Sequence, residues 1–469
     1  MGKPKTTQRM KVLLVCAQNR IRGWSKTGAR SKRLTRHRCG YQFARMISIA
    51  RVVAVVASLF LVILQVPLNA ADWPQWRGPA QDGHVPAGVA VPDRLAAEPK
   101  VLWRVKVGDG LASPVVSAGR VFYLDDQRGT ETLHAADAAT GKELWTAAVD
   151  ETFRDSQSAA GPRCTPLVDG DRVYAQSCRG ELKCLSAADG SLRWRAHYVR
   201  DFHAVFIGEK GQAAGASRHG YNGSPVIDGA RLVACAGGTN GASVVCLDKL
   251  TGRVIWQSQS DIPGYAPPVL GTFGGTRQVV AFTVQGVMGL DAGTGLLLWR
   301  SPVKTALARH VTTPVLVADM VFVASHQAGL VGVKVSREGD AWKAEQAWVD
   351  RNLAINFSSP VAAGGHLYGV GPAKNFICVE AVSGKLAWSQ SGCLTSPADK
   401  AFAAFLVMGQ NILSLTDGGE LILFAAEPGQ FRQVSRVQVC GANWCNPAYA
   451  DGNLFLRDKT ELLCVVLRP

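Results

Sequence analysis

Short runs of alternating apolar and polar residues recur along most of this chain, and turn residues separate them. The run 181–185, Glu-Leu-Lys-Cys-Leu, alternates in this way, which predicts a β-strand with one buried face. Asp-Gly pairs such as Asp169-Gly170 stand between the runs and favour the positive φ of a hairpin turn. Beyond residue 71 the pattern therefore predicts many short strands joined by tight turns.

One longer pattern repeats in phase with these strands. Its clearest copy, at 135–145, reads Ala-Ala-Asp-Ala-Ala-Thr-Gly-Lys-Glu-Leu-Trp. The Asp and Thr side chains can bond the turn backbone and the Gly relaxes its geometry, while the Trp is expected to pack between neighbouring sheets. The residues assigned to this structural repeat are Asp137, Thr140, Gly141, Trp145, Trp194, Asp248, Gly252, Trp256, Asp291, Gly295, Trp299, Gly384 and Trp388.

The period of the repeat predicts the architecture. The outer-strand aromatic residue recurs eight times, from Trp103 to Phe431, at intervals of 40 to 62 residues. A small residue plus Pro opens an apolar strand in most of the eight units, as in Ser113-Pro114. A four-stranded propeller blade takes roughly 40–50 residues, so we predict an all-β, eight-bladed β-propeller over residues 72–469.

The two ends of the repeat region complement each other. The segment 100–104 matches an outer strand, whereas 453–456 and 461–466 match inner strands. Pairing these N- and C-terminal strands in one blade closes the ring and leaves no unpaired edge. Two separate all-β domains are the alternative, which the even spacing disfavours.

The first 70 residues differ in composition from the rest. Residues 1–45 hold 13 Lys and Arg and no Asp or Glu, so a nucleic-acid-binding arm is one interpretation. We favour a basic extension ahead of a true start at Met46, followed by a signal peptide over 46–70. A retained membrane anchor is the alternative. Residues 72–469 then hold 37 Lys and Arg against 36 Asp and Glu, so the net charge of +15 belongs to the leader and no nucleic-acid partner is expected.

The cysteines suit an exported protein, in which disulfides persist. Cys164 with Cys178 and Cys440 with Cys445 are possible disulfide pairs, because each pair brackets one hairpin or tight loop. Zinc-finger spacings are absent from the sequence, so no metal site is predicted. We expect a monomer in the periplasm or outer cell envelope.

The repeat at 135–145 resembles the tryptophan-docking motif of quinoprotein, PQQ-dependent alcohol dehydrogenases. The same motif is typical of the outer-membrane-protein assembly scaffold of Gram-negative bacteria. The segment 72–79, Asp-Trp-Pro-Gln-Trp-Arg-Gly-Pro, is similar to the opening of exported PQQ-binding-like propellers of planctomycete-type bacteria. The resemblance implies the propeller fold for residues 72 to 469.

The enzymes of this resemblance imply a cofactor site that the sequence can test. Such dehydrogenases hold PQQ against an adjacent Cys-Cys disulfide and beside a Ca²⁺ ion bound by Glu, Asn and Asp. No Cys-Cys pair occurs here, and most blades are near the minimum length. We therefore expect no cofactor and a non-catalytic scaffold that binds a protein or glycan. PQQ with Ca²⁺ belongs only to the alternative, an alcohol or sugar dehydrogenase.

A partner is expected on the loops that lead into the innermost strands, since these loops surround the channel on one face. The candidates are polar and aromatic residues of these loops and of an insertion near 200–223: Arg163, His203, His219, Tyr221, Asn222, Tyr265, Arg309, His310, Asn356, Lys400, Asn443 and Asn446. Each of them, alternatively, caps a turn or bonds loop backbone.

The insertion also allows a third hypothesis. Asp201, His203 and His219 could bind a metal or perform acid and base chemistry, as in a hydrolase. No fixed short spacing joins them, so a structural hairpin is the competing interpretation.

Overall fold

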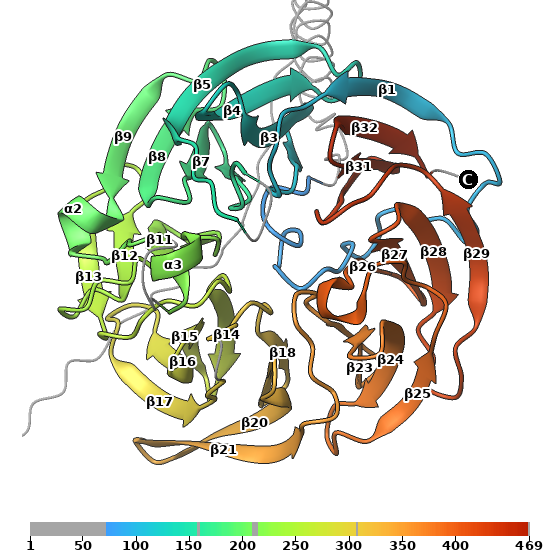
Figure 1. Ribbon diagram of the computed structural model, residues 1–469. Coiled ribbons are helices and arrows are strands. Elements are labelled where there is room, and N and C mark those ends of the chain that lie inside the picture. The colour runs from blue at the N-terminus through green and yellow to red at the C-terminus, as the bar shows by residue number, and fades with distance from the viewer. Residues whose placement is uncertain (1–71, 157–159, 209–213, 306–307, 468–469) are drawn as a thin grey trace, which may run out of the picture. The chain divides into compact units, whose positions relative to one another are not determined.

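The computed structural model describes residues 72–156, 160–208, 214–305 and 308–467. These residues belong to one compact unit, Leu68–Pro469, and form eight four-stranded antiparallel sheets arranged as the blades of a ring (Figure 1). The predicted all-β, eight-bladed propeller is confirmed, and the alternative of two separate domains is wrong. The basic extension 1–45 and the signal peptide 46–70 lie outside the described residues. Within the described ranges no helix has the length and apolar character needed to cross a membrane.

Seven blades are built from four consecutive strands, ordered from the channel outward. The first four of these blades are β2 (Val115–Ser117), β3 (Arg120–Asp126), β4 (Thr130–Asp137) and β5 (Glu143–Glu151); β6 (Leu167–Asp169), β7 (Arg172–Gln176), β8 (Glu181–Ser186) and β9 (Leu192–His197); β10 (Val226–Asp228), β11 (Arg231–Ala234), β12 (Val244–Asp248) and β13 (Val254–Ser258); β14 (Val269–Phe273), β15 (Thr276–Thr283), β16 (Gly286–Asp291) and β17 (Leu297–Pro302).

The next three blades follow the same order, and the eighth closes the ring. They are β18 (Val315–Val317), β19 (Met320–Ser325), β20 (Gly329–Glu338) and β21 (Ala341–Asp350); β22 (Val361–Ala363), β23 (His366–Gly371), β24 (Asn375–Glu380) and β25 (Leu386–Gln390); β26 (Ala403–Met408), β27 (Asn411–Thr416), β28 (Glu420–Ala425) and β29 (Gln433–Gln438). In the closing blade the order is β30 (Ala448–Ala450), β31 (Asn453–Arg457), β32 (Glu461–Val466) and β1 (Val101–Lys106).

The hydrophobic core lies between neighbouring blades. The middle strands are buried on both faces, whereas outer strands alternate: β9 exposes Leu192 and buries Trp194. One cluster joins Phe122 and Leu133 of one blade to Val173 and Leu185 of the next. Each pair of neighbouring blades thus meets in a sheet-on-sheet interface, called a seam here. Middle strands lie between two seams and carry apolar residues on both faces, whereas outer strands are amphipathic.

The tryptophans bridge these seams. The Trp194 indole donates from Nε1 to the carbonyl of Lys249, 3.0 Å away, in the turn of the following blade. That turn is held by Asp248, whose Oδ1 accepts from the Thr251 amide and hydroxyl, both at 2.8 Å. Its Gly252 has φ +73°, and a Cβ there would lie 2.7 Å from the indole. Trp103, Trp145, Trp256, Trp348 and Trp388 donate to backbone carbonyls of the following blade in the same way.

Trp299 departs from this arrangement. Its Nε1 donates to Gln278 Oε1, 2.7 Å away, in its own blade. The reason lies in the following blade, where the long hairpin β20–β21 replaces the Asp-x-x-Thr-Gly turn. This hairpin instead packs along the outer strand β17.

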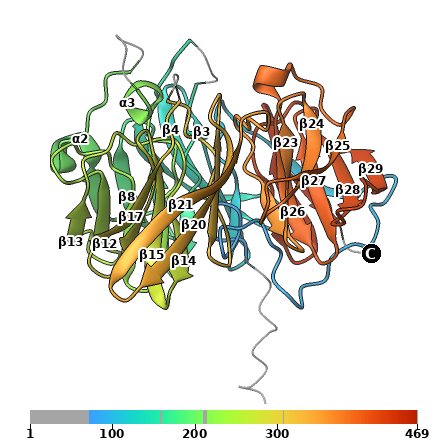
Figure 2. The ribbon, with the colours of Figure 1, turned by 90° about the horizontal axis from the view of Figure 1, so that it is seen from below.

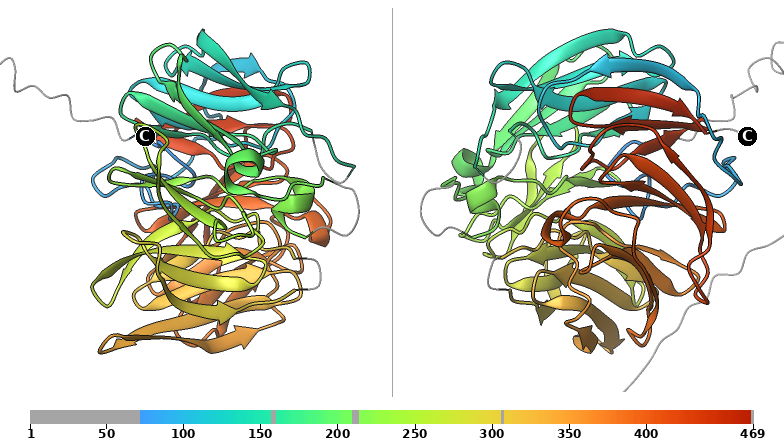
Figure 3. Two further views of the ribbon diagram at one scale, coloured as in Figure 1. Left: turned by 90° about the vertical axis from the view of Figure 1, so that its left-hand side faces the viewer. Right: turned by 45° about the vertical axis from the view of Figure 1, so that its right-hand side comes forward.

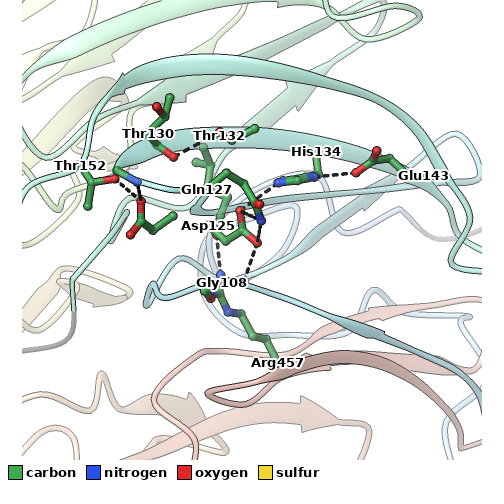
Figure 4. Close-up of polar contacts among 12 residues, drawn as sticks. Gly108, Asp125, Gln127, Thr130, Thr132, His134, Glu143, Thr152 and Arg457 are labelled. Atoms are coloured by element: carbon green, nitrogen blue, oxygen red, sulfur yellow. Dashed lines mark hydrogen bonds and ion pairs between the residues drawn. The ribbon is translucent and has the colours of Figure 1, made fainter.

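The N- and C-terminal strands close the ring as predicted. β1 pairs with β32 in antiparallel register, with Arg104 opposite Leu463. A buried polar network then joins the residues that follow β1 to β31 of the same blade and to β3 of the next blade (Figure 4). Arg457 of β31 donates to the carbonyls of Gly108, at 2.6 Å, and Leu124. The Gly108 amide in turn donates to Asp125 Oδ2 at 2.7 Å, so the closing blade is joined directly to the β2–β5 blade.

The segment ahead of β1, residues 72–100, is called the lead here. Its beginning lies inside the ring rather than across its surface. Trp73 exchanges two backbone hydrogen bonds with Val116 of β2 and is 1% exposed. Figures 1 and 2 show the beginning of the lead, in blue, inside the ring, on the side opposite α3 (Ala216–His219). The later part of the lead runs outward, where the Leu95 amide donates to Ser435 Oγ of the outer strand β29 at 2.9 Å.

The lead contacts most of the innermost strands. Trp76 Nε1 donates to Thr313 Oγ1 at 2.9 Å, and Arg77 donates to the Pro360 carbonyl at 2.6 Å. Further bonds of the lead bring the total to seven blades, through Val116, Val168, Pro268, Thr313, Pro360, Val407 and Tyr449. Propeller channels need something to satisfy the inner strand edges, and here the chain itself supplies it.

Candidate functional site

The loops leading into the innermost strands share one face, and a circumferential chain of hydrogen bonds fixes their ends. The amide of Ser113 donates to Thr165 Oγ1 and the amide of Thr165 donates to Ser224 Oγ, both at 3.1 Å. On the other side of the ring the Thr313 amide donates to Ser359 Oγ at 2.9 Å. These residues precede the prolines of the strands, so the small hydroxyl residue in the motif links one blade to the next. We call the area inside these loops the channel mouth.

A compact polar cluster occupies one side of the channel mouth. The side chain of Arg163, which precedes β6, pairs with Asp155 at 2.9 Å and donates to the His219 carbonyl at 2.8 Å. Asp155 Oδ2 also lies 3.4 Å from His219 Nδ1. The rings of His219 and Tyr265 lie 6.2 Å apart, and the Tyr265 hydroxyl donates to the Gly215 carbonyl at 2.8 Å. Three consecutive blades therefore contribute to one cluster.

Burial sets the protonation of this cluster. Burial lowers the pKa of His219 despite the opposing carboxylate of Asp155, so the imidazole is neutral at neutral pH. Burial raises the pKa of Tyr265, and Arg218, Arg163 and Arg309 oppose that rise. Three guanidinium groups and one carboxylate, that of Asp155, therefore influence the same phenol. The positive charges outnumber the negative one, so the cluster is positively charged.

Aromatic rings occupy the other side of the channel mouth. Phe357 and Trp444 have ring centroids 5.1 Å apart, and Trp444 stacks on Phe402 at 5.8 Å. The Arg309 guanidinium lies over Phe357, 5.9 Å from its centroid, and connects the aromatic side to the basic one. Half-buried Arg and aromatic side chains of this kind are enriched in binding surfaces.

Several candidate residues have structural roles instead. His310 is fully buried, its Nε2 donates to the Val303 carbonyl at 2.8 Å, and burial lowers its pKa. Tyr221 is 2% exposed, and its hydroxyl donates to Val205. Asn443 folds back on Cys445 with two hydrogen bonds. These residues stabilise loops, as the turn-capping alternative proposed.

The remaining candidates divide by exposure. Asn222, Asn356 and Asn446 are half-buried at the starts of innermost strands, together with Arg163, His219, Tyr265 and Arg309. Lys400 is exposed on the 3-10 helix η1 (Ala398–Lys400). His203 is exposed at the C-cap of α2 (Tyr198–Phe202). Figure 3 shows α2 and α3, in green, on one side of the ring.

The insertion does not assemble a catalytic group. Asp201 accepts from the His197 amide and pairs with Arg200, while His219 faces Asp155. The described residues contain no group of three His, Cys, Asp or Glu side chains that could hold a metal ion. Asp201, His203 and His219 therefore serve separate local contacts.

The cysteines form no bond to one another in the structure. None of the ten described cysteines, Cys164, Cys178, Cys440 and Cys445 among them, is in a disulfide. Burial raises the pKa of Cys164 and of Cys440 to about 12, so both thiols are protonated and unreactive. The two proposed disulfides are not formed here.

The donor set does not fit the calcium-quinone site that the resemblance implies. A Ca²⁺ ion takes six or more oxygen ligands, whereas the channel mouth presents guanidinium, imidazole and aromatic groups around one engaged carboxylate. No pair of cysteines lies next to each other in the sequence to form the vicinal disulfide. The lead, rather than an open channel, occupies the axis below the mouth.

Sequence reasoning missed three contributors to this region. Asp155 precedes its strand by twelve residues, and Arg218 lies in α3, so neither stands directly at a proline landmark. Glu131 of β4 is fully buried and accepts from the Cys178 amide at 3.3 Å, and burial raises its pKa to about 7. A Glu within an otherwise apolar strand run is the sequence signal that could have identified it.

The sequence is similar to one known family and to two characterised proteins. A model of the family described as outer membrane protein assembly factor BamB matches residues 93–178 and 154–390. The outer membrane protein assembly factor BamB of Shewanella oneidensis is 23% identical over 398 residues, covering 79% of this chain and 89% of that protein. A polyvinylalcohol dehydrogenase of a Sphingopyxis species is 28% identical over 194 residues, covering 34% of this chain and 29% of that protein.

Solved structures share the fold. BamB from Moraxella catarrhalis has a TM-score of 0.51 at 15% identity, covering 78% of this chain and 98% of that one. Quinohemoprotein alcohol dehydrogenase from Comamonas testosteroni has a TM-score of 0.56 at 14% identity, covering 85% of this chain and 80% of that one. At these identities the likeness establishes the propeller architecture and leaves activity to the site itself.

Proposed function

Because the chain belongs to the family described as outer membrane protein assembly factor BamB, we propose that it is an exported, non-catalytic scaffold of the cell envelope. Its channel mouth binds a partner protein, and a glycan is the other class of partner to test. The observation that carries this proposal is the channel mouth. There the charges of Arg218 and Arg309 act on the Tyr265 phenol, and the Arg309 guanidinium lies over Phe357, which packs against Trp444.

The rigid ring favours binding over catalysis. The loops of the mouth are anchored by hydroxyl-to-amide bonds between blades, so they present their side chains without large ordering costs. Arg and aromatic side chains dominate the energetics of protein interfaces, whereas the described residues of the mouth assemble no nucleophile with an adjacent base.

The proposal is tested by cross-linking capture from an envelope extract with the full chain. Trp444→Ala removes an aromatic side chain of the mouth, and Leu192→Ala on the exposed outer face of β9 is the matched control. We expect a captured species that is lost with Trp444→Ala and kept with Leu192→Ala. Equal capture by both variants would contradict the mouth as the binding surface. Treatment of the extract with a protease, or with a glycosidase, separates the two partner classes.

The dehydrogenase alternative has its own measurement. Similarity to a polyvinylalcohol dehydrogenase and to a quinohemoprotein alcohol dehydrogenase motivates it. The full chain is incubated with PQQ, Ca²⁺, an alcohol or a sugar, and an artificial electron acceptor. We expect no reduction of the acceptor dye above the rate without protein, and turnover would overturn the scaffold proposal.

A further inference from the structure

Two positively charged side chains at the channel mouth have no carboxylate partner among the described residues. Arg218 forms no ion pair there, and its Nε is buried without a hydrogen-bond partner. Arg309 is half-buried, and its guanidinium contacts the Phe357 ring. A guanidinium that has lost much of its hydration without gaining a hydrogen-bonded anion is costly, and a bound anion removes that cost.

The charge balance around Tyr265 indicates how much negative charge the site takes. Arg163, Arg218 and Arg309 face Tyr265 together with Asp155, and His219 is neutral because burial lowers its pKa. Asp155 already pairs with Arg163 at 2.9 Å. The cluster therefore carries about two uncompensated positive charges, which belong to Arg218 and Arg309.

The chemistry of these groups selects the anion. A guanidinium presents its donors as a planar fork that matches a carboxylate, and each such pair is a strong, charge-assisted hydrogen bond. The Phe357 and Trp444 rings beside Arg309 provide apolar surface for the carbon chain of a ligand. We infer that the channel mouth is a binding site for a ligand with two carboxylates, held by Arg218 and Arg309 beside Tyr265.

This inference rests on the proposed function, since it names the ligand chemistry of the same face. The two carboxylates come either from a small dicarboxylate or from neighbouring acidic side chains of a partner. The structure places both arginines on loops of the same face: Arg218 on α3 ahead of β10, and Arg309 ahead of β18. Neither belongs to the Asp155 pair that stabilises the loop, so each can be changed without breaking that pair.

The experiment measures binding of two probes to the full chain by calorimetry. Succinate stands for a free dicarboxylate and a blocked tetra-glutamate peptide stands for an acidic protein segment, with a blocked tetra-glutamine peptide as the uncharged match. We expect at least one acidic probe to bind, tetra-glutamine not to bind, and affinity to fall as salt is raised from low to high concentration. Binding of succinate alone, or of the peptide, identifies the source of the carboxylates.

Variants then locate the site. Arg218→Gln and Arg309→Gln are each expected to raise the Kd by about 10- to 100-fold, as expected for loss of one charge-assisted pair. Arg193→Gln, an exposed arginine of the outer strand β9, is the control and is expected to leave the Kd unchanged. Arg309→Lys keeps the charge and is expected to bind between wild type and Arg309→Gln. Circular dichroism and thermal midpoints establish that each variant is folded.

Two results overturn the inference. One is that neither acidic probe binds, and the other is that folded Arg218→Gln and Arg309→Gln bind as wild type does or lose no more affinity than Arg193→Gln. A chain that captures its envelope partner through Trp444 yet binds neither probe refutes this inference alone. Absence of any captured species with the wild-type chain, together with intact probe binding, refutes the scaffold proposal instead.

Discussion

At the scale of single residues, the repeat depends on a glycine of each turn that packs against the tryptophan of the preceding blade. Gly252 has φ +73° and lies against Trp194, so an alanine there meets both backbone strain and the ring, 2.7 Å from its Cβ. Gly229 also has a positive φ, +59°, but its Cβ would meet nothing within 4 Å. These two glycines therefore separate the backbone effect from the packing effect.

We expect Gly252→Ala to destabilise the fold by about 2–4 kcal/mol and Gly229→Ala by about 1–2 kcal/mol. The larger loss arises because the Trp194 indole must move and its hydrogen bond to Lys249 must lengthen. Urea unfolding followed by tryptophan fluorescence gives both free energies of unfolding. Equal losses in the two variants would show that the indole contributes nothing to the cost.

At the scale of elements, the lead acts as a central plug that ties the blades together. Trp73 is 1% exposed and is packed against Gly78, whose Cβ would lie 2.7 Å from the indole. We expect Trp73→Ala to lower the free energy of unfolding by about 3–5 kcal/mol, because a large buried ring leaves a cavity. Trp342→Ala, at the half-buried tip of the β20–β21 hairpin, is the control and is expected to cost clearly less.

The measurement for the lead is chemical unfolding with amide hydrogen exchange. Exchange should accelerate in β2 and at the starts of β18 and β22, where the lead forms bonds, and not in the outer strands. Unchanged exchange in these innermost strands would mean that the lead rests in the ring without stabilising it.

The blades could be predicted from the sequence, whereas the plug and the channel mouth could be predicted only in part. The Asp-x-x-Thr-Gly and Trp positions lie on one strand pair and its turn, so their spacing reports the fold directly. The lead binds backbone carbonyls such as those of Pro268 and Pro360, and a carbonyl acceptor leaves no mark in the sequence. The loops of the mouth were located, but the place of Arg218, whose charge acts on Tyr265, depends on the turn of α3, which no short pattern specified.

For the whole molecule, closure of the ring depends on a network that contains a histidine between two carboxylates. His134 Nε2 lies 2.9 Å from Asp125 Oδ1, and Nδ1 lies 2.9 Å from Glu143 Oε2 (Figure 4). Both ring nitrogens donate to carboxylates only when the imidazole is protonated. The Tyr123 ring stacks on the imidazole at 4.6 Å, and Arg457 approaches from the closing blade.

The pKa values of this network set the pH range in which closure is strongest. Burial opposes the charged form of His134, but the hydrogen bonds and charges of Asp125 and Glu143 outweigh it and raise the pKa of His134. Burial likewise opposes ionisation of Asp125, yet His134 and the Gly108 amide lower the pKa of Asp125. The stabilisation by His134 is complete below its unfolded pKa of about 6.5 and is lost as the pH rises through its higher folded pKa. The stabilisation by Asp125 is present above about pH 4 and is lost as the pH falls through its lower folded pKa.

We therefore expect the free energy of unfolding to decrease as the pH rises above about 6.5, and His134→Gln to make that decrease shallower because glutamine does not titrate. Glu131, whose pKa burial raises to about 7, accounts for the decrease that remains. His366→Gln, whose ring contacts only a turn carbonyl, is the control and should keep the wild-type pH dependence. Urea unfolding between pH 5 and pH 9 measures the slope for each protein. Hydrogen exchange in β1 and β32 shows where in the ring the pH-dependent weakening occurs. Weaker bonds at Gly108 should open the closing blade before the others. A pH slope in His134→Gln as steep as that of the wild type, or faster exchange spread evenly over all eight blades, would mean that closure does not depend on this histidine.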